Sequence, residues 1–127
     1  MNLLLDTHAA LWLVSAPEKM SAPALKAFRT SGEVFLSIAS LWELANKIAI
    51  GKLELSSGWS QRLPDALAKD GVRLLGVTPE DCNRLSTLPM HHRDPFDRMM
   101  VAQALQRDLA LVSVDAELKL YGVKVVW

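Results

Sequence analysis

Acidic side chains recur in this sequence shortly after apolar runs that are expected to be β-strands. Asp6 follows Leu3-Leu4-Leu5, and Asp115 follows Leu111-Val112-Ser113-Val114. In parallel α/β sheets, chemistry is carried out just outside the carboxyl ends of the strands. We therefore expect one cleft at that edge of the sheet to collect a set of acids. The set is Asp6, Glu43, Asp94, Asp97 and Asp115.

Carboxylates gathered in one cleft repel one another and raise one another's pKa values. A hard divalent cation relieves that repulsion, and Mg²⁺ or Mn²⁺ accepts oxygen ligands while keeping several waters. The single cysteine of the chain excludes a Cys-based zinc site. A bound Mg²⁺ or Mn²⁺ would activate water and neutralise charge on a phosphate ester, so the pattern favours phosphodiester hydrolysis. The hydroxyls of Thr7, Ser37 and Ser113 could bind metal-bound water or phosphate nearby.

Each acid also has a purely structural explanation. Asp6 and Asp115 could cap helices, since Asp is a favoured N-cap residue. Asp94 stands before a proline, which is typical of a helix start. Glu43 could pair with Lys47, four residues later on the same helix. Capping does not explain Glu43, which lies deeper in its helix, nor the convergence of all five acids at one edge.

The positions of the acids depend on elements that alternate along the chain. Strands are expected at residues 2–5, 34–37, 72–77, 109–114 and 123–127. Helices are expected at 7–15, 21–31, 38–50, 59–69, from 78 to the loop at 88–93, 94–107 and 115–120. This alternation predicts an α/β fold with a mostly parallel central sheet and helices on both of its faces.

The composition limits the kind of protein. A chain of 127 residues is the size of one domain, and 50% hydrophobic with 22% charged residues is not typical of disorder. We expect neither a membrane span, because no apolar run reaches about 18 residues, nor a secretory signal. The lone Cys82 favours a reducing compartment such as the cytoplasm. Lys and Arg equal Asp and Glu, at 14 each, so bulk positive charge does not bind nucleic acid here.

Five segments together resemble a known family. They are LLDTHAALW at 4–12, LSIASLWEL at 36–44, GKL at 51–53, RDPFDRMMVAQA at 93–104 and LVSVD at 111–115. Their order and spacing resemble those of PIN domains, and more narrowly of the VapC-type toxins of bacterial type II toxin–antitoxin pairs. The resemblance covers essentially the whole chain. It implies one PIN-like domain over residues 1–127, built as a three-layer α/β/α sandwich.

The resemblance implies a Mg²⁺- or Mn²⁺-dependent endoribonuclease. The four catalytic, metal-binding acids of the family would correspond to Asp6, Glu43, Asp97 and Asp115 in this sequence. Asp97 is preferred to Asp94 because its spacing from the following helix, MVAQA at 100–104, resembles the family motif. Asp94 would then be a helix cap or a supporting acid.

The resemblance also implies partners. Similar toxins form homodimers, and a small antitoxin that also binds operator DNA holds them inactive. The RNA substrate and the antitoxin are therefore the expected partners of this chain, with operator DNA bound only through the antitoxin. A second interpretation is a catalytically inactive PIN-like module that acts only within a complex. The four intact acids disfavour it.

Two further groups of residues allow more than one interpretation. His91, His92, Arg93 and Arg98 could contact RNA phosphate beside the acids, or they could belong to a solvated loop. The four tryptophans and five methionines are expected mostly in the core, with a few forming an apolar surface for a partner.

Overall fold

The computed structural model describes all residues, 1–127. Five strands form one sheet: β1 (Leu3–Leu5), β2 (Val34–Ser37), β3 (Val72–Leu75), β4 (Ala110–Val112) and β5 (Val125–Val126). Their order across the sheet is β3-β2-β1-β4-β5, and every neighbouring pair is parallel. The expected parallel sheet is confirmed, and β1 lies at its centre.

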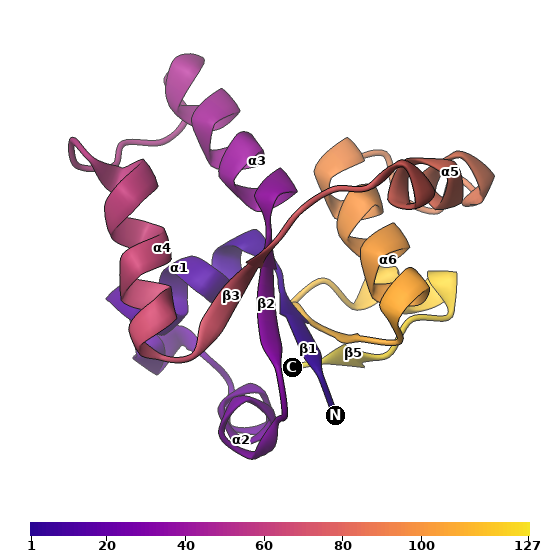
Figure 1. The fold of residues 1–127 in the computed structure, drawn as a ribbon, viewed down its shortest axis with the longest axis horizontal. Helices are drawn as coiled ribbons and strands as arrows, with labels where there is room; N and C mark the ends of the chain where they lie inside the picture. Colours follow the sequence, from indigo (N-terminus) through magenta and orange to yellow (C-terminus); the bar gives the residue numbers. More distant parts are fainter.

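Six helices and two 3-10 segments surround the sheet. They are α1 (Thr7–Ser15), η1 (Pro17–Lys19), α2 (Ala22–Thr30), α3 (Ile38–Ala49), α4 (Trp59–Lys69), α5 (Pro79–Thr87), α6 (Pro95–Arg107) and η2 (Ala116–Tyr121). Figure 1 shows α1, α2 and α4 on one side of the sheet and α5 and α6 on the other. The expected three-layer α/β/α sandwich is thereby confirmed. None of the helices combines the length and apolarity that crossing a membrane requires.

The central strand shows why the apolar runs are continuous. Leu3 and Leu5 pack into the core shared with Leu67 of α4, whereas Leu4 points to the opposite face and packs with Val101 of α6. Successive side chains of a strand alternate between the two faces of the sheet. Because helices cover both faces, β1 has no polar position until Asp6. The first acid therefore stands where the strand leaves the core.

Most element bounds agree with the sequence expectations, but the strands are shorter. β3 was expected at 72–77 and ends at Leu75, because its only neighbour, β2, ends opposite at Ser37. β4 was expected at 109–114 and ends at Val112. After it the chain turns, and the hydroxyl of Ser113 accepts the Asp115 N–H at 3.1 Å. The last strand covers only residues 125–126 of the expected 123–127, and η1 was not anticipated.

A buried carboxylate joins α5 to α6, on the face of the sheet opposite α1, α2 and α4. Asp81 accepts hydrogen bonds from Arg107 Nη1 at 2.6 Å and Nη2 at 3.1 Å, from Gln103 Nε2 at 3.3 Å and from the Thr78 N–H at 3.0 Å. Burial raises the pKa of Asp81, but these hydrogen bonds and the Arg107 charge outweigh it and bring the pKa below its usual 3.8. Asp81 is therefore a structural acid.

We expect Asp81→Asn to lower the free energy of unfolding by about 1.5–3 kcal/mol at neutral pH, because charge-assisted hydrogen bonds are lost. A lowered folded-state pKa gives stability that is present above the unfolded pKa and is lost as the pH falls through the folded pKa. Urea unfolding of both proteins from neutral to strongly acidic pH should show their difference shrinking below about pH 4. A difference that does not change with pH would contradict this role.

Candidate functional site

All five acids expected at the strand ends line one small pocket. The pocket has a volume of about 220 Å³ and is lined by Asp6, Glu43, Asp94, Asp97 and Asp115, with Thr7, His8, Lys47, Ser113 and Val114. Its lining residues follow β1 and β4 or belong to α3 and the start of α6. Figure 1 labels α3, α6 and β1. The strand order reverses direction at β1 and β4, which is the usual place for a binding site in an open α/β sheet.

Asp6 is at once a helix cap and a pocket acid. Its Oδ1 accepts the Ala9 N–H at 2.7 Å at the start of α1. The residue is only 7% exposed. Burial raises its pKa above the usual 3.8 and the Glu43 charge adds to this, while Ser113, the Ala9 amide and His8 lower the pKa in part. The capping explanation is correct, and it leaves the charge of Asp6 in the pocket.

Glu43 carries the second carboxylate, from the middle of α3. The hydroxyl of Thr7 donates to its Oε1 at 2.5 Å and lies 3.0 Å from the Ser40 hydroxyl. Lys47 Nζ lies 2.9 Å from Glu43 Oε2, so the pair four residues apart does form. The hydrogen bond to Glu43 is the main cause that raises the pKa of Lys47, and Asp94 and Asp97 add to it. Lys47 is therefore a cation held among the acids.

Asp94 and Asp97 lie at the start of α6 and have different roles. Asp94 Oδ1 accepts the N–H groups of Phe96 at 2.8 Å and of Asp97 at 3.0 Å, as an N-cap does. Asp97 caps nothing, and its carboxylate is surrounded by other acids. Burial, followed by the charges of Asp94 and Glu43, raises its pKa from 3.8 to about 7. A bound cation would favour the charged form of the Asp97 carboxylate.

Asp115 is fixed through both carboxylate oxygens. Its Oδ1 accepts the Glu117 N–H at 3.0 Å at the start of η2. Its Oδ2 lies 2.9 Å from His92 Nε2, and the same nitrogen lies 3.5 Å from Asp97 Oδ2. The His92 side chain is only 19% exposed and contacts both carboxylates, so it is not a solvated loop side chain, while its contact with RNA phosphate stays a prediction. In the sequence, the only signal that places His92 beside the acids is its position two residues before Asp94, the N-cap of α6.

The hydroxyls expected near the acids differ in their roles. Thr7 orients Glu43, and Ser113 lines the pocket while accepting the Asp115 N–H. Ser37 is fully buried, caps α3 by accepting the Ala39 N–H at 3.0 Å, and does not line the pocket. The expectation that Ser37 meets metal-bound water or phosphate is therefore not supported by its position.

Arg98 is a structural residue instead of a phosphate contact. It is 8% exposed, and its guanidinium donates to the carbonyls of Leu85, Leu88 and Pro89 and to Tyr121 Oη. These four contacts tie α6 to the end of α5, to the start of the 88–93 loop and to η2. Arg98 therefore fits neither interpretation that the sequence left open, RNA contact or solvated loop, because both of its Nη atoms bind groups inside the protein.

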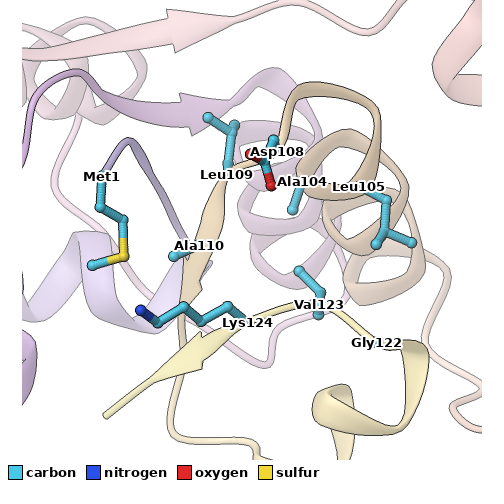
Figure 2. A pocket seen from close by; sticks show the side chains of 9 residues that line it. All are labelled: Met1, Ala104, Leu105, Asp108, Leu109, Ala110, Gly122, Val123 and Lys124. Carbon is cyan, nitrogen blue, oxygen red and sulfur yellow. The ribbon is translucent and has the colours of Figure 1, made fainter.

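A second hollow, of about 460 Å³, lies at the opposite end of the sheet, near Met1 and Ala110 (Figure 2). Its charged side chains are Lys124, beside β5, and Asp108, at the end of α6 (Figure 2). The remaining lining is mostly apolar. The hollow gathers no set of acids and has no place in the chemistry of the pocket.

The donor set of the acidic pocket fits a hard divalent cation. Its lining supplies five carboxylates, two hydroxyls and no thiol. Oxygen donors of this kind suit Mg²⁺, Mn²⁺ or Ca²⁺ better than a soft metal. The Lys47 ammonium compensates only part of the negative charge, since Asp97 keeps a pKa of about 7 in this pocket. The pocket thus has the oxygen donors of an acidic metal site.

The chain belongs to the PIN domain family, whose family model matches residues 3–124. It is 30% identical over 122 residues to Ribonuclease VapC22 of Mycobacterium tuberculosis, which covers 93% of this chain and 90% of that protein. The sequence resemblance to PIN domains and VapC proteins is thereby confirmed.

Solved structures share the fold at low sequence identity. The structure of VapBC2 from Rickettsia felis bound to a promoter DNA fragment matches with a TM-score of 0.70 and 12% identity, over 98% of this chain and 97% of that chain. The structure of VapBC-1 from nontypeable Haemophilus influenzae matches with a TM-score of 0.68 and 17% identity, over 98% and 96% of the two chains. Both confirm the α/β/α architecture.

Proposed function

We propose that residues 1–127 form one PIN domain that acts as a metal-dependent endoribonuclease, the toxin of a type II toxin–antitoxin pair. The observation that carries the proposal is the convergence of four acids from four separate segments on one pocket. The pKa of Asp97, at about 7, indicates that the acids are not compensated by the protein alone. The name of the relative from M. tuberculosis, a ribonuclease, supports the substrate class.

The proposed metal ligands are Asp6, Glu43, Asp97 and Asp115, and the proposed ion is Mg²⁺ or Mn²⁺. Such an ion, when bound, lowers the pKa of a water and neutralises charge on the phosphate under attack. The protein's own groups prepare the site. Thr7 and Lys47 each hold one oxygen of Glu43, so that carboxylate is oriented before any ligand arrives.

Lys47 has a second task in this proposal. Its side chain is 36% exposed at the rim of the pocket while its ammonium group contacts Glu43. This cation is accessible to a phosphate that enters the pocket. A fixed positive group placed beside the reacting phosphate stabilises the negative charge that develops there.

The activity should depend strictly on a divalent cation. Purified protein, freed of any antitoxin, is incubated with total cellular RNA in Mg²⁺, in Mn²⁺ and in EDTA. We expect discrete cuts with the metals and none with EDTA. A folded protein that cuts none of several RNAs under any of these conditions would instead favour the inactive binding module.

The proposed cellular partner is an antitoxin that covers the acidic pocket, in the cytoplasm. The two related structures are VapBC assemblies, and the one from R. felis carries a promoter DNA fragment. This chain has no net charge, so we assign any contact with operator DNA to the antitoxin.

We propose a homodimer that uses an apolar groove beside the pocket. The groove, of about 510 Å³, lies between α3 and the α5–α6 pair and is lined by nine residues, eight of them hydrophobic, including Trp42 and Phe96. Trp42 is 68% exposed and packs edge-on against Phe96, with ring centroids 5.1 Å apart. A large aromatic exposed in such a groove is typical of an interface between proteins.

Trp42→Glu should convert the dimer into a monomer, because a charge would have to be buried without a partner. Size-exclusion chromatography with light scattering measures the mass of each protein. Leu120→Glu is the matched control, since Leu120 is also exposed, at 61%, but lies on η2 outside the groove. A Trp42→Glu protein that stays dimeric would place the interface elsewhere.

A further inference from the structure

The two ring nitrogens of His92 face different partners. Nδ1 accepts the backbone N–H of Asp94 at 3.1 Å. Nε2 lies 2.9 Å from Asp115 Oδ2 and 3.5 Å from Asp97 Oδ2. The ring therefore connects the α6 cap with two carboxylates of the pocket.

The partner of Nδ1 fixes where the ring carries its proton. A backbone amide can only donate, so Nδ1 must present its lone pair to the Asp94 N–H. The neutral ring then has its proton on Nε2, and that proton points to Asp115. A nitrogen that carries a proton has no lone pair for a metal. His92, Asp115 and Glu117 have possible ligand atoms within 4.8 Å of one another, but the hydrogen-bond pattern removes His92 from that set.

The backbone around His92 holds the ring in this orientation. The His92 N–H donates to Tyr121 Oη at 2.8 Å. Tyr121 Oη also accepts from Arg98 Nη1 at 3.2 Å, and the same guanidinium nitrogen donates to the Pro89 carbonyl at 2.9 Å. These hydrogen bonds tie the 88–93 loop to α6 through Arg98 and to η2 through Tyr121. A donor held so firmly can orient a carboxylate.

We propose that His92 is a positioning residue of the acidic pocket, acting through its Nε2–H on Asp115 and holding that carboxylate toward Asp97. This inference rests on the proposed metal centre. With Oδ1 bound to the Glu117 amide and Oδ2 bound to His92, Asp115 has a fixed orientation. Hydrogen bonds that orient a ligating carboxylate typically contribute 10- to 100-fold to metal affinity.

The test compares two substitutions that differ in one hydrogen-bond donor. His92→Gln keeps an N–H donor at a similar reach, whereas His92→Phe keeps a ring but removes the donor. Calorimetric titration with Mn²⁺ should show affinity about 10-fold weaker or more for His92→Phe, and within about threefold of wild type for His92→Gln. His91→Phe is the matched control, because His91 is exposed and its ring contacts Tyr121 instead of the acids. Urea unfolding establishes that each variant is folded.

Nitrogen-15 NMR of the imidazole ring supplies a readout that needs no metal and no activity. We expect a protonated Nε2 and an unprotonated Nδ1 in the metal-free protein, and the same pattern after Mg²⁺ is added. The reverse tautomer, or loss of the Nε2 proton on adding Mg²⁺, would overturn the proposal. So would wild-type Mn²⁺ affinity in His92→Phe. A wild-type protein that binds no Mn²⁺ would instead overturn the proposed metal centre itself.

Discussion

Replacing Asp6 by Asn is expected to abolish RNA cleavage while leaving the fold intact. Substitutions that only touch a metal-binding side chain typically cost 10- to 100-fold, so losing a direct ligand charge should cost more than about 100-fold. The amide of Asn can still accept the Ala9 N–H, because Asn and Asp are equally good N-caps. Burial already raises the pKa of Asp6, so removing its charge should not destabilise the metal-free protein.

A second substitution separates the cap from the charge. Asp6→Ala loses both, and we expect it to unfold about 1 kcal/mol more easily than Asp6→Asn. Cleavage of total RNA and growth arrest on expression measure activity, and urea unfolding in EDTA measures stability. If Asp6→Asn fails to fold, Asp6 is a structural cap and its place among the proposed ligands falls.

Local signals made the helices predictable. Helices were expected to begin at residues 21 and 78, and the hydroxyls of Ser21 and Thr78 there accept the N–H three residues later. Helix α6 begins at the proline after Asp94, as expected. Each of these features depends on fewer than five consecutive residues, so no knowledge of the tertiary structure was needed.

The acidic pocket was predictable for a different reason. In a parallel sheet all carboxyl ends of the strands lie at one edge, so acids after different strands must meet. Asp6 and Asp115 are 109 positions apart in the printed sequence and still line one pocket. Once the sheet was expected to be parallel, the meeting followed from topology.

Contacts between distant segments were not predictable. The ends of β3 and β4 depend on where neighbouring strands stop, which the apolar runs do not record. His92 depends on Tyr121 and Asp115, which lie more than 20 residues away. From the sequence alone Arg98 is interpreted as an exposed basic residue, but in the structure its guanidinium donates to the carbonyls of Pro89 and Leu88. Such roles need the packed structure.

Asp97→Asn is expected to reduce cleavage more than about 100-fold, whereas Asp94→Asn should cost less than about tenfold. Asp94 uses Oδ1 to cap α6, and an Asn there accepts the same two N–H groups. Asp97 makes no cap, and its carboxylate faces Asp94, Glu43 and Asp6. Its charge, and not its hydrogen bonding, is what the pocket would use.

The same substitution should stabilise the metal-free protein at neutral pH. The folded-state pKa of Asp97, about 7, lies above its usual 3.8, so the folded protein holds this proton more tightly than the unfolded chain. The free energy of unfolding of wild type must then fall as the pH rises from about 4 to about 7. One pKa unit corresponds to about 1.4 kcal/mol, and solvent screening reduces the sum. Above that range Asp97→Asn should be more stable by about 1–3 kcal/mol.

Urea unfolding in EDTA, at about pH 5 and about pH 8, tests this sign, and RNA cleavage in Mn²⁺ tests the order of the two acids. If Asp97→Asn raises the stability of the protein and lowers its activity, the Asp97 side chain serves to bind a ligand and does not stabilise the fold. Greater loss of cleavage in Asp94→Asn would transfer the third ligand to Asp94. A destabilised Asp97→Asn would show that the charge of Asp97 is compensated inside the protein, and the raised pKa of Asp97 would no longer support a cation in this pocket.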